Sequence, residues 1–209
     1  MNYLEALQKR YSVKKFDKNK KVSNDVLKRI LEAGRLSVSS LGLQPYKMYV
    51  VESQKMLQKL VPAFYNPSQI STCSHLIVLV SKKVIEGEYL EKYFEHIKNV
   101  RNIPQENLTG FRSSIDTYMS VKNEEALLQW NESQSYIVLS NLIFAAALES
   151  VDTCPMEGFK QETIDEILGI NPEHEKVSVT LALGYRSEED VFQTMKKVRK
   201  PEDMLFKFL

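Results

Sequence analysis

One short segment limits the fold more than any other part of the sequence. The run His75-Leu76-Ile77-Val78-Leu79-Val80 places five apolar residues in succession. A strand with one face in water alternates apolar and polar residues, whereas a strand covered on both faces is apolar throughout. The run therefore predicts a central strand, and helices must cover both faces of its sheet.

The remaining patterns predict an α+β chain in which helices surround a small sheet. Further strands are expected at residues 46–51 and at residues 177–183, where apolar residues alternate with others. Helices are expected at residues 2–8, from Ser23 onward, and at 54–61, 86–100, 107–121, 124–148 and 161–168, with Gly169 closing the last one.

The longest predicted helix, at residues 124–148, is apolar nearly all round from Tyr136 to Leu148. Such a helix packs on several sides at once, either in a crowded core or at a subunit interface. Ser140 and Asn141 interrupt this segment, which is shorter than the roughly 20 residues of a bilayer span, so no membrane association is expected. The preceding residues, 84–121, are predicted to form a mobile helical cover.

Composition excludes several classes of protein. The 209 residues fit one domain over 1–209, and 28 basic and 27 acidic residues leave a formal net charge of +1. No long-range field then favours nucleic acid or an anionic membrane. Cys73 and Cys154 lie far apart, outside any zinc or disulfide pattern, which suits a reducing cytoplasm. The N-terminus lacks the pattern of a signal peptide, so secretion is not expected.

The standard catalytic signatures are absent. The seven glycines form neither a GxGxxG nor a Walker loop, and no GxSxG nucleophile elbow occurs. His75 stands at the start of the buried strand and is interpreted as a structural residue rather than a ligand. We therefore expect neither a metal site nor a catalytic triad.

Basic residues instead gather at the two ends of the chain. Arg10, Ser12 and Lys14 alternate near the start, and Lys197 and Arg199 alternate near the end. Alternation places such side chains on one side of an extended backbone, where two sets can clamp one phosphate of a nucleotide-like cofactor. A solvated lysine-rich face is the alternative interpretation, because more lysines follow Lys14.

Five segments carry a resemblance to a known family. They are Arg10-Tyr11-Ser12-Val13-Lys14-Lys15-Phe16-Asp17, Ser39-Ser40-Leu41-Gly42-Leu43-Gln44-Pro45-Tyr46, Asn66-Pro67-Ser68-Gln69, Pro155-Met156-Glu157-Gly158-Phe159, and Gly184-Tyr185-Arg186 followed by Lys197-Val198-Arg199. In this order and spacing the chain resembles the nitroreductase family of FMN flavoproteins. The resemblance implies a nitroreductase-like fold, with a central, mostly antiparallel sheet surrounded by helices, and an intertwined homodimer.

The resemblance also implies a role for each matching position. Arg10, Lys197 and Arg199 would hold the FMN phosphate with Ser12 alongside, and Lys14 would lie near N1 and O2, where reduced flavin carries negative charge. Asn66 would bond the N3 and O4 edge. The turn Pro155-Met156-Glu157-Gly158 would face N5 and O4 with the N–H groups of its last two residues.

Other matching positions would act across a subunit boundary or depart from the family. Ser39 and Ser40 match residues that reach the cofactor of the opposite subunit. Some relatives carry Lys where this chain has Gln69, which predicts a less positive flavin potential here. Gly42 replaces an Asn of some relatives and removes one polar contact.

The activity implied is ping-pong hydride transfer from NADH or NADPH, through flavin N5, to an electrophilic acceptor such as a nitroaromatic or quinone. Protein groups orient the flavin and tune its charge, so no general acid or base is expected. Phe111 and Tyr118 either stack on the acceptor or only pack their helix. Flavin, enone or pteridine reduction and a non-catalytic flavin-binding regulatory role stay open as alternatives, as does the choice of nicotinamide.

Overall fold

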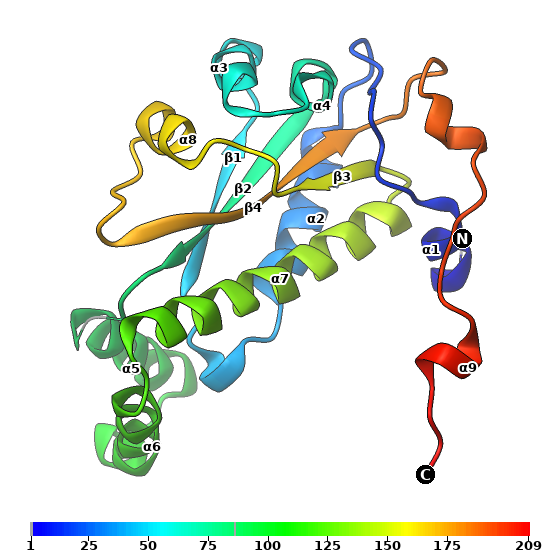
Figure 1. Cartoon of the computed structure of the whole chain (residues 1–209). Helices are drawn as coiled ribbons and strands as arrows, with labels where there is room; N and C mark the ends of the chain where they lie inside the picture. Colours follow the sequence, from blue (N-terminus) through cyan, green and yellow to red (C-terminus); the bar gives the residue numbers. More distant parts are fainter. Residues whose placement is uncertain (1, 86) are drawn as a thin grey trace.

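The computed structural model describes residues 2–85 and 87–209, which build a four-stranded sheet with helices on both faces (Figure 1). The strands are β1 (Tyr46–Val51), β2 (His75–Lys82), β3 (Asp152–Met156) and β4 (Glu175–Gly184). Their order is β1-β2-β4-β3, and each neighbouring pair is antiparallel. β2 lies inside the sheet and is buried from His75 to Ser81, which confirms the predicted central strand.

The strand expected at residues 177–183 is confirmed as β4, and every residue from Val177 to Gly184 is buried because β4 also lies inside the sheet. One strand differs from the sequence-based expectation. β3 was not expected from the sequence. It is an edge strand, where the missing N–H group of Pro155 removes no bond that the sheet needs.

The helices surround the sheet. They are α1 (Tyr3–Lys9), α2 (Asn24–Arg35), α3 (Gln54–Leu60), α4 (Pro67–Thr72), α5 (Gly87–Arg101), α6 (Thr109–Ser120), α7 (Glu124–Leu148), α8 (Gln161–Leu168) and α9 (Glu202–Leu205). The helices expected from the sequence are confirmed within a few residues. The expected start at Glu86 lies outside the described residues, and α6 follows a 3-10 turn, η3 (Gln105–Leu108).

Local capping accounts for several of these boundaries. The Asn2 side chain accepts from the Glu5 N–H group at 3.0 Å while the Glu5 carboxylate accepts from the Asn2 N–H group, a reciprocal capping box. The Ser23 hydroxyl accepts from Val26 N at 3.4 Å at the start of α2. Gly169 ends α8 with φ of 66°, a left-handed conformation that favours glycine.

Alternate residues of β2 feed two hydrophobic cores. Leu76, Val78 and Val80 belong to the cluster on the side of α3, α4 and α8. Ile77 and Leu79 belong to the cluster on the side of α2 and α7 (Figure 1). Burying one such side chain contributes about 1.5–3 kcal/mol, so the continuous apolar run stabilises both layers.

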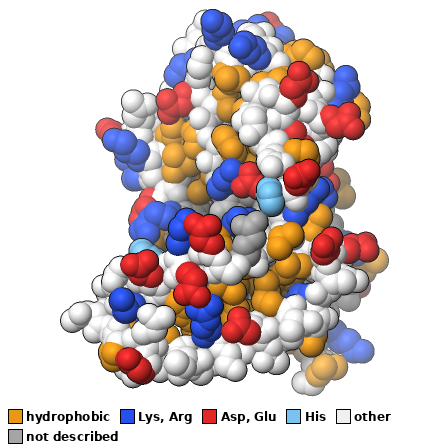
Figure 2. All heavy atoms as spheres, turned by 90° about the vertical axis from the view of Figure 1, so that its left-hand side faces the viewer, with side chains coloured by type: hydrophobic (Ala, Val, Ile, Leu, Met, Phe, Trp, Pro, Cys, Tyr) orange, Lys and Arg blue, Asp and Glu red, His pale blue; other side chains and the backbone are white. Residues whose placement is uncertain are grey.

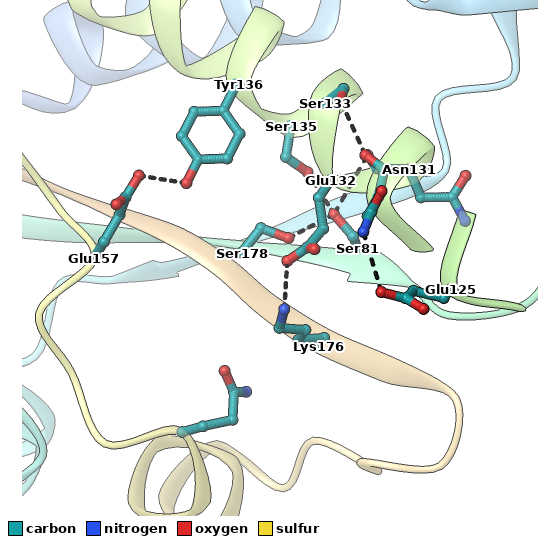
Figure 3. A network of polar contacts seen from close by, with 12 residues as sticks. Ser81, Glu125, Asn131, Glu132, Ser133, Ser135, Tyr136, Glu157, Lys176 and Ser178 are labelled. Carbon is teal, nitrogen blue, oxygen red and sulfur yellow. Dashed lines mark hydrogen bonds and ion pairs between the residues drawn. The ribbon is translucent and has the colours of Figure 1, made fainter. Parts of the chain in front are cut away.

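A buried hydroxyl cluster fixes α7 on the sheet. Ser81 Oγ of β2 lies 2.8 Å from Ser135 Oγ of α7 and 2.7 Å from Ser178 Oγ of β4 (Figure 3). Lys176 Nζ pairs with Glu132 Oε1 at 2.9 Å next to it. The three hydroxyls are satisfied inside the core, so they specify the register of α7 as well as its contact with the sheet.

The helical pair α5 and α6 forms a third cluster at one end of the molecule (Figure 1). It is tied to the 3-10 turn η1 (Ser40–Gly42) by two phenols: Tyr89 Oη lies 2.7 Å from Leu43 O, and Tyr93 Oη donates to Leu41 O at 2.9 Å. Over residues 2–85 and 87–209, no helix is long and apolar enough to cross a membrane.

Candidate functional site

The two ends of the chain meet at one pocket. A cavity of about 710 Å³ is lined by Arg10, Ser12, Lys14, Pro155, Lys197 and Arg199 together with nine other residues. Lys197 Nζ donates to the carbonyl oxygens of Leu7 and Arg10, so the segment after α1 and the segment before α9 lie side by side (Figure 1). The two alternating basic sets therefore line one cavity, whose volume is in the range of small-molecule sites.

Backbone contacts place the N-terminal set on the edge of the sheet. Val13 N donates to Thr153 O at 3.1 Å, and Ser12 forms a parallel bridge with Thr153 of β3. Val13 and Phe16 are buried while Ser12 and Lys14 are half-buried. The segment is extended, so Arg10, Ser12 and Lys14 share the side that faces the pocket.

Asp190 joins this segment to the C-terminal arm (residues 191–209). Its Oδ2 accepts from Lys14 N at 2.7 Å and from Lys15 N at 3.3 Å, and its Oδ1 accepts from Phe192 N at 3.0 Å. The side chain is only 2% exposed. Burial would raise the pKa of Asp190, but the N–H groups of Lys14, Phe192 and Lys15 outweigh it and hold the pKa below its usual value.

The cations of the pocket repel one another. Burial, and then the Arg199 charge, lower the pKa of Arg10, while burial followed by Arg10 and Arg199 lowers the pKa of Lys197. Arg10 Nε is buried without a hydrogen-bond partner among the described residues. Unneutralised positive charge and an orphaned guanidinium donor together suit a phosphate, which accepts several charge-assisted hydrogen bonds.

Several pocket residues escaped the sequence analysis. Tyr11, Ile143, Phe192 and Met195 supply apolar or aromatic lining, and Arg186 adds a further cation. Arg186 is already paired, since its NH2 group lies 2.5 Å from Asp152 Oδ1 and its guanidinium lies 4.6 Å from the centre of the Tyr11 ring. The Gly184-Tyr185-Arg186 motif was the one signal available for it.

Lys14 lies next to a buried polar group from α4. Lys14 Nζ is 3.8 Å from Cys154 Sγ, and Gln69 Nε2 is 4.0 Å from the same sulfur. Gln69 is 2% exposed, and its Oε1 lacks a partner in the described part of the chain. The amide thus keeps one acceptor free beside the Lys14 ammonium.

The turn after β3 presents free donors. Its carbonyl groups are bonded: Thr180 Oγ1 donates to Met156 O at 3.1 Å, Phe159 N to Glu157 O at 3.0 Å, and Tyr65 N to Gly158 O at 3.0 Å. Within residues 2–85 and 87–209, no acceptor pairs with the N–H groups of Glu157 and Gly158, and both residues are exposed. Two adjacent exposed donors can bind the acceptor edge of a ligand.

Nine expected residues do not line the pocket: Ser39, Ser40, Asn66, Gln69, Phe111, Tyr118, Met156, Glu157 and Gly158. Ser39 precedes η1 and Ser40 is its first residue; Ser39 Oγ accepts from Gln44 N, and Ser40 N donates to Gln134 Oε1. Phe111 packs on Phe94 with ring centres 5.8 Å apart, and Tyr118 packs on Trp130 at 5.4 Å. Asn66 is exposed at the start of α4, where its side chain caps no N–H group.

The face opposite the two chain ends has a mixed charge. Its side chains of both signs are interspersed with hydrophobic ones (Figure 2). Away from the pocket, Lys47 pairs with Glu175 at 2.7 Å. Among the described residues, no group of three or more His, Cys, Asp or Glu side chains could hold a metal ion.

Comparison with known proteins identifies the family. A sequence model of the Nitroreductase family matches residues 7–185. A relative from Staphylococcus haemolyticus, provisionally named an NAD(P)H nitroreductase, is 34% identical over 213 residues, which cover 97% of this chain and 95% of that protein.

Solved structures share the fold. A provisionally named NAD(P)H:FMN oxidoreductase from Staphylococcus epidermidis superposes with a TM-score of 0.86 at 24% identity, covering 100% of this chain and 96% of that one. A provisionally named nitroreductase from Exiguobacterium sibiricum, solved in complex with FMN, gives a TM-score of 0.86 at 23% identity over 100% and 98% of the two chains. With the predicted α+β architecture confirmed and most of its length matched, this chain belongs to the nitroreductase family.

Proposed function

We propose that this protein is an FMN-dependent NAD(P)H oxidoreductase that works as a homodimer. The observation that carries the proposal is the pocket in which Arg10, Lys197 and Arg199 lie together, with Arg10 Nε lacking a hydrogen-bond partner among the described residues. The relative's name as an NAD(P)H nitroreductase and the FMN bound in the Exiguobacterium structure support the same cofactors here.

The residues present fit the parts of FMN. Arg10, Lys197 and Arg199, with Ser12, offer cations and a hydroxyl for the phosphate. The free N–H groups of Glu157 and Gly158 suit acceptors at the N5 and O4 edge, with Pro155 and Met156 holding that turn on β3. Asn66 and the free Gln69 Oε1 suit the N3 and O4 edge.

When bound, FMN would supply hydride transfer at N5 in a ping-pong cycle. The donor of the first half-reaction is NADH or NADPH, and the acceptor of the second is an electrophile such as a nitroaromatic or quinone. The half-buried Lys14 ammonium, only partly screened by water, would stabilise negative charge at N1 and O2. Gln69 lies next to Lys14 but adds no charge. The chain's task is to bind, orient and exclude water rather than to transfer protons itself.

A second copy of the chain would complete the site. Ser39 and Ser40, at the start of η1, do not line the pocket of their own protomer. Leu36 and Val38 next to them are 66% and 72% exposed, an apolar surface that a partner would cover. In the dimer these serines reach the cofactor of the other subunit.

The acceptor is a small molecule admitted next to the α5–α6 pair. We assign this pair, within residues 84–121, as the cover of the single domain, with Phe111 and Tyr118 as candidate contacts for the acceptor. Both cysteines are free and buried, which suits a cytoplasmic protein.

Absorption spectroscopy tests the proposal directly. The purified protein should carry flavin bands or gain them on reconstitution with FMN, and anaerobic NADH or NADPH should bleach them. Bands that persist with both nicotinamides would instead support a flavin-binding module without turnover. A colourless protein that cannot be reconstituted would refute the proposed function.

A further inference from the structure

A phenol from α7 reaches the turn that presents the free N–H groups. Tyr136 Oη donates to Glu157 Oε1 at 2.5 Å, and Figure 3 shows the two side chains pointing toward each other from α7 and from the segment after β3. Tyr136 is 40% exposed and does not line the basic pocket. The contact therefore links the long helix to the turn without belonging to the phosphate cluster.

The base of this phenol is rigid. Ser135, the residue before Tyr136, is fully buried and bonded to Ser81 of β2, so the helix cannot slide or rotate there without breaking the hydroxyl cluster (Figure 3). The Glu132–Lys176 ion pair anchors the preceding turn to β4. Tyr136 thus offers a fixed point from which to hold the exposed Glu157 side chain.

The side chain that it holds would otherwise have other partners. Glu157 is exposed, and neither its own N–H group nor that of the adjacent Gly158 has an acceptor among the described residues. An ionised carboxylate only accepts hydrogen bonds, and backbone N–H groups are among the donors that it binds. Burial, and then the hydrogen bond to Glu157, raise the pKa of Tyr136, which keeps the phenol a neutral donor.

We propose that Tyr136 is a positioning residue of the cofactor site, which holds the Glu157 carboxylate away from the N–H groups of Glu157 and Gly158 and so keeps them available to the flavin N5 and O4 edge. This inference rests on the proposed function. Its second effect is electrostatic: a carboxylate that accepts a hydrogen bond from a phenol has part of its charge dispersed into that bond and therefore opposes the negative charge of reduced flavin less than a free carboxylate does.

A double-mutant cycle of Tyr136→Phe and Glu157→Gln tests the inference. Tyr3→Phe is the matched control, because Tyr3 is exposed and its side chain makes no hydrogen bond among the described residues. The readouts are the midpoint potential of bound FMN, the dissociation constant for FMN, and the thermal unfolding midpoint. Tyr136→Phe should make the potential more negative and weaken FMN binding by about two- to tenfold, the range that matches one hydrogen bond.

In the Glu157→Gln background, Tyr136→Phe should leave the potential nearly unchanged, because no free carboxylate is released. An equal shift in both backgrounds, or an unchanged potential in Tyr136→Phe alone, would overturn the inference. The proposed function would still stand in that case, provided that the wild-type protein binds FMN and is reduced by a nicotinamide. A wild-type protein that binds no FMN would overturn both.

Discussion

Arg199 gives the sharpest residue-level test of the phosphate site. It lines the pocket, and its charge adds to the effect of burial in lowering the pKa of Arg10 and, after burial and Arg10, the pKa of Lys197. Arg199→Ala should weaken FMN binding by roughly tenfold or more, since a hydrogen bond to a charged group contributes about 1.5–3 kcal/mol. Affinity for riboflavin, which lacks the phosphate, should stay within about twofold.

Fluorescence titration of apoprotein with both ligands measures these affinities. Lys200→Ala is the control, because Lys200 is the next residue along the arm and does not line the pocket. If Arg199→Ala weakened riboflavin and FMN equally, Arg199 would contact another part of the cofactor or act on the fold.

Asp190 predicts a specific dependence of stability on pH. Its folded-state pKa lies below the ordinary value, so its contribution is complete above the unfolded pKa of about 3.9 and is lost as the pH falls below that value. Asp190→Asn should lower the free energy of unfolding by about 1.5–3 kcal/mol at pH 7, because one amide cannot accept from Lys14, Lys15 and Phe192 on both sides.

Urea unfolding at a series of pH values provides the measurement. The difference between wild type and Asp190→Asn should shrink as the pH falls below 4. Glu189→Gln is the control, since Glu189 is exposed and its carboxylate forms an ion pair with the neighbouring Lys15 rather than accepting the three backbone N–H groups. A difference that stayed constant down to pH 3 would show that the charge of Asp190 is not what the three N–H groups require.

Residue spacing predicted which N-terminal side chains share one side of a segment, but it did not predict how that segment contacts the C-terminal arm. Arg10, Ser12 and Lys14 alternate on one strand-like segment, so their shared side follows from backbone geometry alone. The contact of Asp190 with Lys14 joins residues 176 positions apart. No local pattern encodes such a pairing, because it depends on where the fold brings the arm back.

At the scale of elements, boundaries were predictable where periodicity or caps were strong. The apolar run of β2 and the capped α2 stand out in the sequence and were placed correctly. β3 has five residues, including Pro155, and its stability comes from pairing with β4 rather than from its own pattern. α4 is short and begins at Pro67, which reads equally well as a turn.

Tyr89 of α5 contacts the loop around η1, which lies far from it in sequence, so removal of its hydroxyl should affect that loop. Leu41 and Gln44 have φ of 57° and 46°, left-handed values that cost about 1 kcal/mol or more each in residues other than glycine. Tyr89 Oη lies 2.7 Å from Leu43 O and 2.8 Å from Gln44 O. Tyr89→Phe should therefore lower the free energy of unfolding by about 1–2 kcal/mol.

Amide hydrogen exchange should also become faster over residues 40–45 than elsewhere in the protein. Tyr3→Phe again serves as the control, because it removes an exposed hydroxyl without a partner in the described part of the chain. Unchanged exchange in this loop, even with reduced global stability, would mean that the strained turn does not depend on α5.

At the scale of the whole molecule, the exposed apolar surface is the feature that one protomer leaves unexplained. The end of the C-terminal arm carries Met204, Leu205, Phe206, Phe208 and Leu209, and Phe208 is 95% exposed. The arm runs along one side of the molecule and away from the sheet (Figure 1). Aromatic side chains of this kind contribute most when a partner buries them.

The proposed homodimer predicts that the arm and the cofactor site depend on each other. Phe206→Ser with Phe208→Ser should raise the dimer dissociation constant by at least about tenfold, since burial of one Phe contributes about 1.5–3 kcal/mol. Sedimentation equilibrium measures this dissociation constant, with Lys207→Ser, the residue between the two phenylalanines, as the control.

Because Ser39 and Ser40 would act on the partner's cofactor, FMN affinity should decrease when the protein is diluted, and it should do so in the double variant only. A variant that became monomeric yet bound FMN as tightly as wild type at every concentration would show that one protomer holds the cofactor alone.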